Sequence, residues 1–331
     1  MEHKKVLFFS SEKKEKLLSQ QYSLTDIYCL KKLFKKTMIT NKLFSYKYLD
    51  ADIYFSWWAS GSIIPMIYSF IFSKKIYVVA GGNESTIYFD SITGKGAGYT
   101  AYNPIKKFIV RFVLRHATEV ICVSNFQKNE CLKLVKRDYL VVYNGIDTDT
   151  FKPLSLPREY LTMVCNLEKS VVEIKRLKNF IYACSELSKS ENNIKVMIVG
   201  KHGNAYQEVS ELVKELGLDE QFNFIDLVDN AEMPRIYNES KVYVQVSDTE
   251  TFGVSALEAY KCGCKLVLSR SGALEEVFSD VGFFCNHNDY SDITRSLKAA
   301  LNSTENVNNK NILNYNREYR LKALRQIIKD D

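Results

Sequence analysis

Short apolar runs alternate with longer mixed segments along the whole chain. In the mixed segments apolar residues recur every three or four positions, which is typical of amphipathic helices, whereas the short runs suit buried strands. This alternation predicts βα units and therefore an α/β fold built on parallel sheets. Strands are expected at 6–9, 53–58, 76–80, 120–123 and 140–143 in the first half, and at 161–165, 195–199, 222–225, 242–246, 265–268 and 282–285 in the second.

The same pattern predicts two domains. Each half of the 331-residue chain has enough strands for a doubly wound, Rossmann-like sheet, and one core rarely grows beyond about 250 residues. The segment "YNGIDTDTFKPLSLPREY" holds two of the five prolines and a turn-prone Asn-Gly pair, so we place the boundary there. We expect domains at 1–153 and 154–310, and a terminal helix at about 311–331 that packs back on the first domain.

Two segments bear on membranes. Residues 53–72 carry no charge over a length that could span a bilayer, but their serines, glycine and proline favour a buried strand, a turn and a buried helix. Residues 30–49 carry six lysines among apolar residues, which indicates either a face that contacts anionic lipid or a solvated basic helix. The apolar run near the N-terminus is too short for a signal peptide. A cytoplasmic protein is expected, with peripheral contact at the inner face of the membrane as one option.

Composition argues against nucleic-acid and metal binding. The net charge of +6 is modest and no recognised nucleic-acid motif accompanies the lysines. The eight cysteines form no CxxC pair and the four histidines are scattered. We therefore expect reduced, packed thiols and no metal site.

Two glutamates flank an expected helix start in "DTETFGVSALEAYKCGCKLVL", residues 248–268. Glu250 lies in the loop after one expected strand, and Glu258 lies about one turn inside the helix that follows. Unpaired N–H groups at a helix start favour an anion, and Gly253 lets a ligand approach the backbone. Because a carboxylate accepts bonds from two hydroxyls, the stretch indicates a phosphorylated sugar or a nucleotide sugar. Two ordinary surface charges are the alternative.

Several segments, in order along the chain, resemble a known family. They are "CVSNFQKNECL" (122–132), "VVYNGIDTDTFKP" (141–153), "VMIVGKHG" (196–203), the glutamate stretch, and "SGALEEVF" (271–278). Together they resemble the signature segments of retaining glycosyltransferases of family 4. The resemblance implies the GT-B fold, in which two Rossmann-like domains face a cleft. The first would bind the acceptor and the second the nucleotide-sugar donor.

The resemblance also implies roles for single residues of the second domain. Glu258 would hold the ribose of the donor, and Glu250 would hold hydroxyls of the transferred sugar. The diphosphate would meet the backbone at Phe252, Gly253, Val254 and Ser255.

Other family positions fall in less similar segments. In "VCNLEKSVVEIKRLKNFIYA", Lys175 aligns with the family's lysine, with Arg176 and Lys178 as competitors. Asn166 occupies the position of the family's arginine. The nucleotide base is expected near 225–228, where Val228 is the candidate contact.

The first domain departs further from the family. Its loop after the first strand, "FFSSEKKE", lacks the family's glycines, and "VVAGGNES" lacks the histidine that relatives often have. In "VVAGGNES", Gly81 and Gly82 are candidates for a loop whose backbone a ligand can approach closely. Asn83 and Glu84 are candidates for contacts to sugar, diphosphate or acceptor.

The resulting hypothesis is a retaining glycosyltransferase. It would move a sugar from a nucleoside diphosphate sugar, in the UDP or GDP form, to an acceptor hydroxyl, with Glu250 and Lys175 as catalytic residues and without metal or another cofactor. A lipid-linked or membrane-surface acceptor is favoured over a soluble glycan or a protein. The alternatives are a catalytically inactive relative that binds nucleotide sugar or glycan, and a nucleotide-sugar epimerase or a phosphorylase on the same fold.

Overall fold

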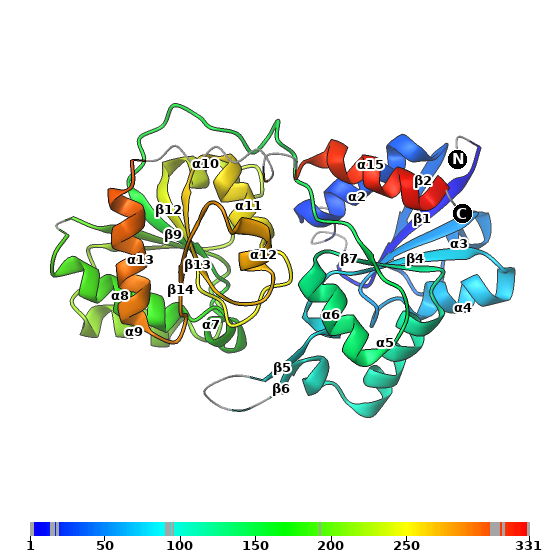
Figure 1. Cartoon of the computed structure of the whole chain (residues 1–331), viewed down its shortest axis with the longest axis horizontal. Helices are drawn as coiled ribbons and strands as arrows, with labels where there is room; N and C mark the ends of the chain where they lie inside the picture. Colours follow the sequence, from blue (N-terminus) through cyan, green and yellow to red (C-terminus); the bar gives the residue numbers. More distant parts are fainter. Residues whose placement is uncertain are drawn as a thin grey trace. The chain divides into compact units, whose positions relative to one another are not determined.

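Figure 1 shows the computed structural model, which describes residues 3–13, 17, 20–89, 94, 96–191, 193–304, 312 and 315–329. The chain divides into two compact units. Unit 1 comprises Met1–Asp147 and Asn314–Asp331, and unit 2 comprises Thr148–Leu313. The division therefore lies at Asp147, a few residues before the expected position, and the chain returns to unit 1 at its end.

Unit 1 is built on one sheet of six parallel strands in the order β2-β1-β3-β4-β7-β8. Five of these strands confirm the sequence prediction, and β2 was missed. The strands are β1 (Lys5–Ser10), β2 (Lys36–Thr40), β3 (Ile53–Trp57), β4 (Lys75–Ala80), β7 (Glu119–Cys122) and β8 (Leu140–Val141).

The lysine-rich segment 30–49 is not a single helix, so that alternative is wrong. It forms the end of α2 (Gln21–Leu33), the edge strand β2 and the short helix α3 (Lys47–Asp50). β2 pairs only with β1, and along it Met38 is buried whereas Lys36 is exposed. An edge strand tolerates an exposed lysine such as Lys36 because only one of its sides is paired.

Helices cover both faces of the unit 1 sheet (Figure 1). One face packs on three helices around buried residues such as Met66, Val113 and Cys131. On the other face, α2 lies against the terminal helix α15. The remaining helices and the hairpin are α4 (Ile63–Phe72), α5 (Pro104–His116), α6 (Asn125–Leu134), α15 (Arg317–Lys329), the 3-10 turns Asn83–Ser85 and Tyr99–Ala101, and β5 (Ile87–Phe89) with β6 (Gly96–Gly98).

The uncharged stretch 53–72 forms β3, a turn and α4, as expected. Pro65 stands in the first turn of α4, where a missing N–H removes no intrahelical bond. Within the described ranges, no helix combines the length and the apolar character that a bilayer crossing requires.

A buried ion pair holds α15 on unit 1. Arg320 has no exposed surface and donates to both oxygens of Asp26 on α2, at 2.5 Å from Nε and 2.9 Å from Nη2. Asp26 also accepts from Trp57 Nε1 at 2.7 Å, and Arg320 also donates to the carbonyls of Val142 and Tyr143. Both buried charges are thus paired and hydrogen-bonded. Residues 311, 313–314 and 330–331 of the expected helix range lie outside the described residues.

Unit 2 is a second sheet of six parallel strands, in the order β11-β10-β9-β12-β13-β14. All six confirm the sequence prediction. The strands are β9 (Tyr160–Val164), β10 (Lys195–Val199), β11 (Phe222–Ile225), β12 (Ser240–Gln245), β13 (Lys265–Ser269) and β14 (Gly282–Cys285).

The helices of unit 2 also occupy both faces of its sheet (Figure 1). α8, α9 and α13 pack around Phe180, Val209 and Leu297, and α10 lies against α11. All eight cysteines of the chain are buried and free, as expected. The helices are α7 (Lys169–Ile174), α8 (Leu177–Ser188), α9 (Tyr206–Glu215), α10 (Met233–Glu239), α11 (Val254–Lys261), α12 (Leu274–Phe278) and α13 (Tyr290–Asn302).

Candidate active site

Most sequence-predicted site residues of unit 2 gather at one edge of its sheet. Because the strands are parallel, the loops after β9, β10, β11, β12 and β13 all leave from their carboxyl ends. In open α/β sheets this edge is where ligands bind. The loop after β12, residues 246–253, is central because β12 is flanked by β9 and β13.

Glu250 forms an ion pair with Lys175 at this edge. Glu250 Oε2 accepts from Lys175 Nζ at 3.0 Å and from Gln245 Nε2 at 2.6 Å. Oε1 has no hydrogen-bond partner among the residues that the structure describes. Both charged side chains are about a quarter exposed, at 22% and 26%. One carboxylate oxygen and one ammonium group are therefore held in place while still reachable by a ligand.

A second, deeper ion pair holds the turn that carries Lys175. Arg176 adopts the left-handed conformation, with φ of +51°, and its guanidinium binds both carboxylate oxygens of Asp248. Asp248 also contacts His287 Nε2 at 3.1 Å, and its N–H donates to the carbonyl of Ile174. Burial lowers the pKa of His287. Arg176 therefore joins the α7–α8 turn to the loop after β12.

The start of α11 offers unpaired backbone donors beside Glu250. Gly253 has φ of +92°, and a side chain there would meet Leu274. No described group accepts from the N–H of Val254 or Ser255, as is usual in the first turn of a helix. Gly272 also has positive φ, and any side chain at that position would collide with the Glu250 carbonyl. The two loops thus pack too closely for larger residues.

Glu258 is buried one turn inside α11. Its Oε2 accepts from the hydroxyl of Tyr237 on α10 at 2.9 Å. Burial raises the pKa of Glu258 to about 7, and the Tyr237 hydrogen bond opposes this shift. The Glu258 carboxyl group is therefore close to half ionised at neutral pH.

The loops after β9, β10 and β11 leave from the same carboxyl edge of the sheet. Their strands lie on the side of β12 away from β13. Asn166 Oδ1 accepts from the N–H of Lys201 at 3.0 Å. His202 stacks on Tyr206 with ring centroids 4.1 Å apart, and its Nε2 is buried without a partner in the described part of the chain. Val228 is half-buried in the loop after β11. The orphaned imidazole nitrogen lies in the region where a nucleotide base was expected.

The four candidates of unit 1 follow β4. Gly81 and Gly82 pack against the rings of Trp57 and Trp58, and a Cβ on either glycine would come within 2.4 Å of a ring atom. Asn83 begins a 3-10 turn. Glu84 is buried, its carboxylate accepts from the N–H groups of Ala59 and Ser60, and burial raises its pKa. These residues join the turn after β3 to the turn after β4.

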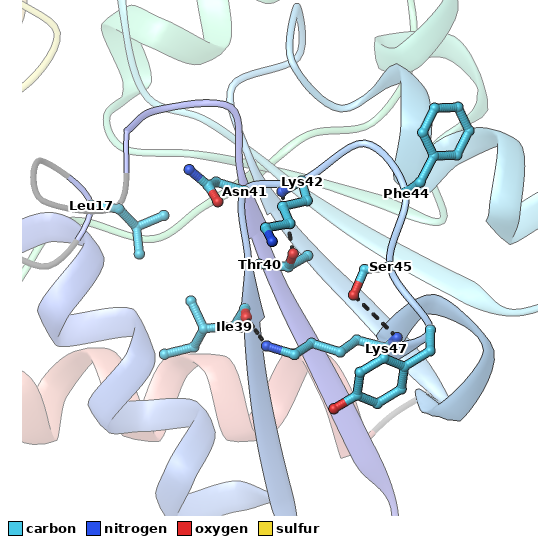
Figure 2. A pocket seen from close by; sticks show the side chains of 9 residues that line it. Leu17, Ile39, Thr40, Asn41, Lys42, Phe44, Ser45 and Lys47 are labelled. Carbon is cyan, nitrogen blue, oxygen red and sulfur yellow. Dashed lines mark hydrogen bonds between the residues drawn. The ribbon is translucent and has the colours of Figure 1, made fainter.

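A pocket of about 520 Å³ opens beside β2 in unit 1 (Figure 2). Lys47 Nζ donates to the carbonyl of Ile39 at 2.6 Å, and the Lys42 N–H donates to Thr40 Oγ1. This pocket belongs to the lysine-rich segment 30–49. Its lining residues are Leu17, Ile39, Thr40, Asn41, Lys42, Phe44, Ser45, Tyr46 and Lys47.

Sequence reasoning missed Gln245, Tyr237, Asp248 and His202. Asp248 opens the quoted glutamate stretch and Gln245 ends the strand before it, so their proximity to Glu250 was available as a signal. Tyr237 stands 21 residues before its partner Glu258, and no local pattern links the two.

Comparison with known proteins identifies the class of protein. Residues 152–318, half of the chain, match the family described as glycosyl transferases group 1. The chain belongs to this family, as the sequence resemblance implied.

Curated relatives are similar over part of their length. N-acetyl-alpha-D-glucosaminyl L-malate synthase of Bacillus anthracis is 28% identical over 200 residues, covering 56% of this chain and 51% of the relative. Alpha-monoglucosyldiacylglycerol synthase of Streptococcus pneumoniae is 22% identical over 215 residues, covering 61% of this chain and 48% of the relative. The chain thus spans about half the length of these relatives.

Solved structures share the fold at low sequence identity. HepE from Anabaena, solved in complex with UDP-glucose, gives a TM-score of 0.78 at 14% identity, with 99% of this chain and 100% of that chain covered. Sucrose-phosphate synthase from Thermosynechococcus elongatus gives 0.76 at 12% identity, with 99% of each chain covered. These likenesses confirm the expected GT-B fold.

Proposed function

We propose that the protein transfers a sugar from a nucleoside diphosphate sugar to an acceptor hydroxyl with retention at the anomeric carbon. One observation carries the proposal: the Lys175–Glu250 pair, 3.0 Å long, lies beside the unpaired N–H groups of α11. Lys175 and these N–H groups can bind a diphosphate. Next to them, Glu250 Oε1 can accept a hydrogen bond from a sugar hydroxyl.

Each group has a distinct role in this reaction. As the glycosidic bond breaks, negative charge develops on the leaving diphosphate, and Lys175 with the first N–H groups of α11 stabilises it. Glu250 Oε1 accepts from a hydroxyl of the sugar, and Glu258 accepts from the ribose in its ionised form. These groups are fixed before the reaction by Gln245 and by the Arg176–Asp248 pair, which limits reorganisation.

The donor is a UDP or GDP sugar, and its base lies against the loops that carry His202 and Val228. HepE, a structural neighbour, is solved in complex with UDP-glucose. The acceptor hydroxyl belongs to a lipid-linked molecule at the inner face of the cytoplasmic membrane, and unit 1 binds it. The lysine- and aromatic-lined pocket beside β2 supports an anionic acceptor, and the eight free, buried cysteines fit a reducing compartment.

The reaction proceeds without a metal ion, because lysine and helix N–H groups supply the positive charge. The residues described here include no group of three His, Cys, Asp or Glu side chains arranged to hold a metal. Treatment with EDTA is expected to leave the transfer rate unchanged, and Mg²⁺ or Mn²⁺ should not raise it. A loss of rate that either ion restores would contradict this mechanism.

The direct test combines binding and turnover. A thermal-shift screen over UDP-, GDP- and ADP-sugars identifies the donor, since a ligand that binds only the folded state raises its stability. Hydrolysis of that donor is then followed in the wild type, in Glu250→Ala and in the control Glu186→Ala, which alters an exposed carboxylate on α8. Turnover should fall only in Glu250→Ala.

A binding protein without catalytic activity is the second candidate. It is favoured by Asn166, which stands where relatives have an arginine and already accepts from the Lys201 N–H. If the protein bound a donor tightly but neither hydrolysed nor transferred the sugar of any donor, this candidate would be established. The same result would contradict the transferase.

A further inference from the structure

Two neighbouring helices of unit 1 leave a broad apolar face uncovered. We define the α4–α5 face by six side chains, each between 41% and 73% exposed. α4 has no charged residue, and its opposite side is buried at Met66 and Ser69. A helix that is apolar all round requires an apolar neighbour on every side. The six residues are Ile67, Phe70, Ile71, Phe72, Ile105 and Phe108.

Ring contacts make this face continuous. Phe112 of α5 lies 6.0 Å from Phe70 of α4 and 6.0 Å from Phe108, measured between ring centroids. Farther along, Tyr68 of α4 stacks on Tyr48 of α3 at 4.3 Å. That stack packs α4 against α3, and further exposed apolar residues lie on and before α3, namely Leu43, Phe44, Tyr46 and Leu49.

The charged residues of α4 and α5 all have one sign. α5 carries Lys106, Lys107, Arg111 and Arg115, and neither α4 nor α5 contains an acidic residue. Lys106 Nζ lies 3.8 Å from the centroid of the Tyr102 ring, and Arg111 lies over Tyr99. Exposed aromatic and aliphatic side chains next to lysine and arginine are typical of helices that lie in the interface of an anionic bilayer.

We infer that the α4–α5 face docks unit 1 on the surface of a bilayer rich in anionic phospholipid. The apolar side chains enter the boundary between headgroups and acyl chains, and the α5 cations contact lipid phosphates. A second copy of this chain fits this face poorly, because a two-fold contact would bring two basic α5 helices together. This inference rests on the proposed function and deepens it. The α4–α5 face is the surface that brings the enzyme to a lipid-linked acceptor.

The test is sedimentation of the 331-residue chain with vesicles. We expect binding to vesicles of phosphatidylglycerol and phosphatidylcholine at low salt, weaker binding in high salt, and little binding to phosphatidylcholine alone. The double variant Ile71→Ser/Phe108→Ser should reduce the partition coefficient by about tenfold or more, since two exposed apolar side chains that would enter the bilayer are lost. Lys107→Gln/Arg111→Gln should reduce binding to anionic vesicles only.

The matched control is Leu154→Ser, which removes an exposed apolar side chain of unit 2. It should leave vesicle binding unchanged. Wild-type protein that ignores anionic vesicles, or a double variant that binds them normally, overturns the inference. A wild-type dimer that the double variant converts to a monomer, without vesicle binding by either, assigns the face to a protein contact instead.

Donor binding is measured on the same proteins, so that the two proposals fail separately. A double variant that loses vesicle binding while a UDP- or GDP-sugar still raises its melting temperature supports the docking face. Vesicle binding without any donor-induced shift contradicts the proposed function and leaves the docking face supported.

Discussion

Three cations, Lys175, Arg176 and Lys178, compete for one role in the sequence, and their contacts separate them. Lys175 meets Glu250, Arg176 is buried against Asp248, and Lys178 pairs with Glu208 on the surface. The left-handed turn at Arg176 divides α7 from α8, so adjacent side chains leave in different directions. Of the three, Lys175 is the one that pairs with Glu250, which precedes the start of α11 by four residues.

Lys175→Ala is expected to lower kcat by about 10²–10³-fold, if loss of an oxyanion donor is a guide. Donor affinity should change less, because the lysine acts mainly on charge that develops during bond breaking. Lys178→Ala is the matched control, since it removes a neighbouring lysine from an exposed pair that contributes little. Equal losses in both variants would show that Lys175 has no special role.

Glu258 should make donor binding depend on pH. Its pKa is raised from 4.5 to about 7, so the fold favours the protonated form. Stability of the free protein should therefore fall as pH rises from about 4.5 to about 7, whereas binding of ribose hydroxyls needs the ionised form. The affinity for a UDP- or GDP-sugar should rise by about tenfold between pH 6 and pH 8.

Calorimetric titration at those two pH values measures this change. A nucleotide sugar is the suitable probe because its diphosphate has no free terminal phosphate that titrates near neutral pH. Glu258→Gln should bind more weakly and without the pH dependence. A wild-type affinity that is constant across this range would exclude Glu258 as an ionised donor ligand.

At the level of secondary-structure elements, the turn between α7 and α8 is positioned by the loop after β12. The Arg176–Asp248 pair is almost fully buried, with side chains 6% and 2% exposed. Each element therefore holds the other at the carboxyl edge of the sheet. The reactive pair lies directly next to this contact, because Lys175 follows α7 and Glu250 follows Asp248 by two residues.

Asp248→Asn should lower the free energy of unfolding of unit 2 by about 3 kcal/mol or more, because Arg176 keeps its buried charge without a charged partner. Urea denaturation followed by far-UV circular dichroism measures this loss. Glu186→Gln, which breaks an exposed pair, should cost less than about 0.5 kcal/mol. We also expect kcat to fall in Asp248→Asn. An unchanged kcat would show that the Arg176–Asp248 pair does not position Lys175.

For the whole molecule, unit 1 is assembled from both ends of the chain. The terminal helix α15 is joined to it by the buried Arg320–Asp26 pair and by a bridge between Ile146 and Asn316. Folding of unit 1 therefore needs residues that follow all of unit 2 in the sequence. The chain's division into units is consequently not a simple division into two halves.

Arg320→Met should destabilise unit 1 by about 3–5 kcal/mol, because Asp26 would remain buried and charged. The only two tryptophans, Trp57 and Trp58, lie in unit 1, so their fluorescence reports its unfolding in urea. Donor binding by unit 2 should persist in the variant below that transition. An unchanged fluorescence midpoint would contradict the structural importance of this pair.

The sequence predicted eleven strands, the start of α11 and the approximate domain boundary, because these depend on periodicity and turn chemistry within short windows. It missed β2 (Lys36–Thr40), because the lysine-rich segment 30–49 that contains this strand also suits a helix. It identified Glu250 and Glu258 through a motif and left the neighbouring cation ambiguous. Gln245, Tyr237 and His202 carry no such motif, and their contacts depend on chain segments far apart.

Amphipathic patterns and the order of motifs were enough to establish the family and the GT-B fold, since both are encoded locally and repeated along the chain. Tertiary packing alone decided which cation meets Glu250 and how strongly Glu258 resists ionisation. It also decided that α4 and α5 expose apolar side chains beside the basic residues of α5. Each of these depends on what surrounds a side chain in space. Burial and pairing bring together residues such as Asp26 and Arg320, whose separation in sequence no local pattern spans.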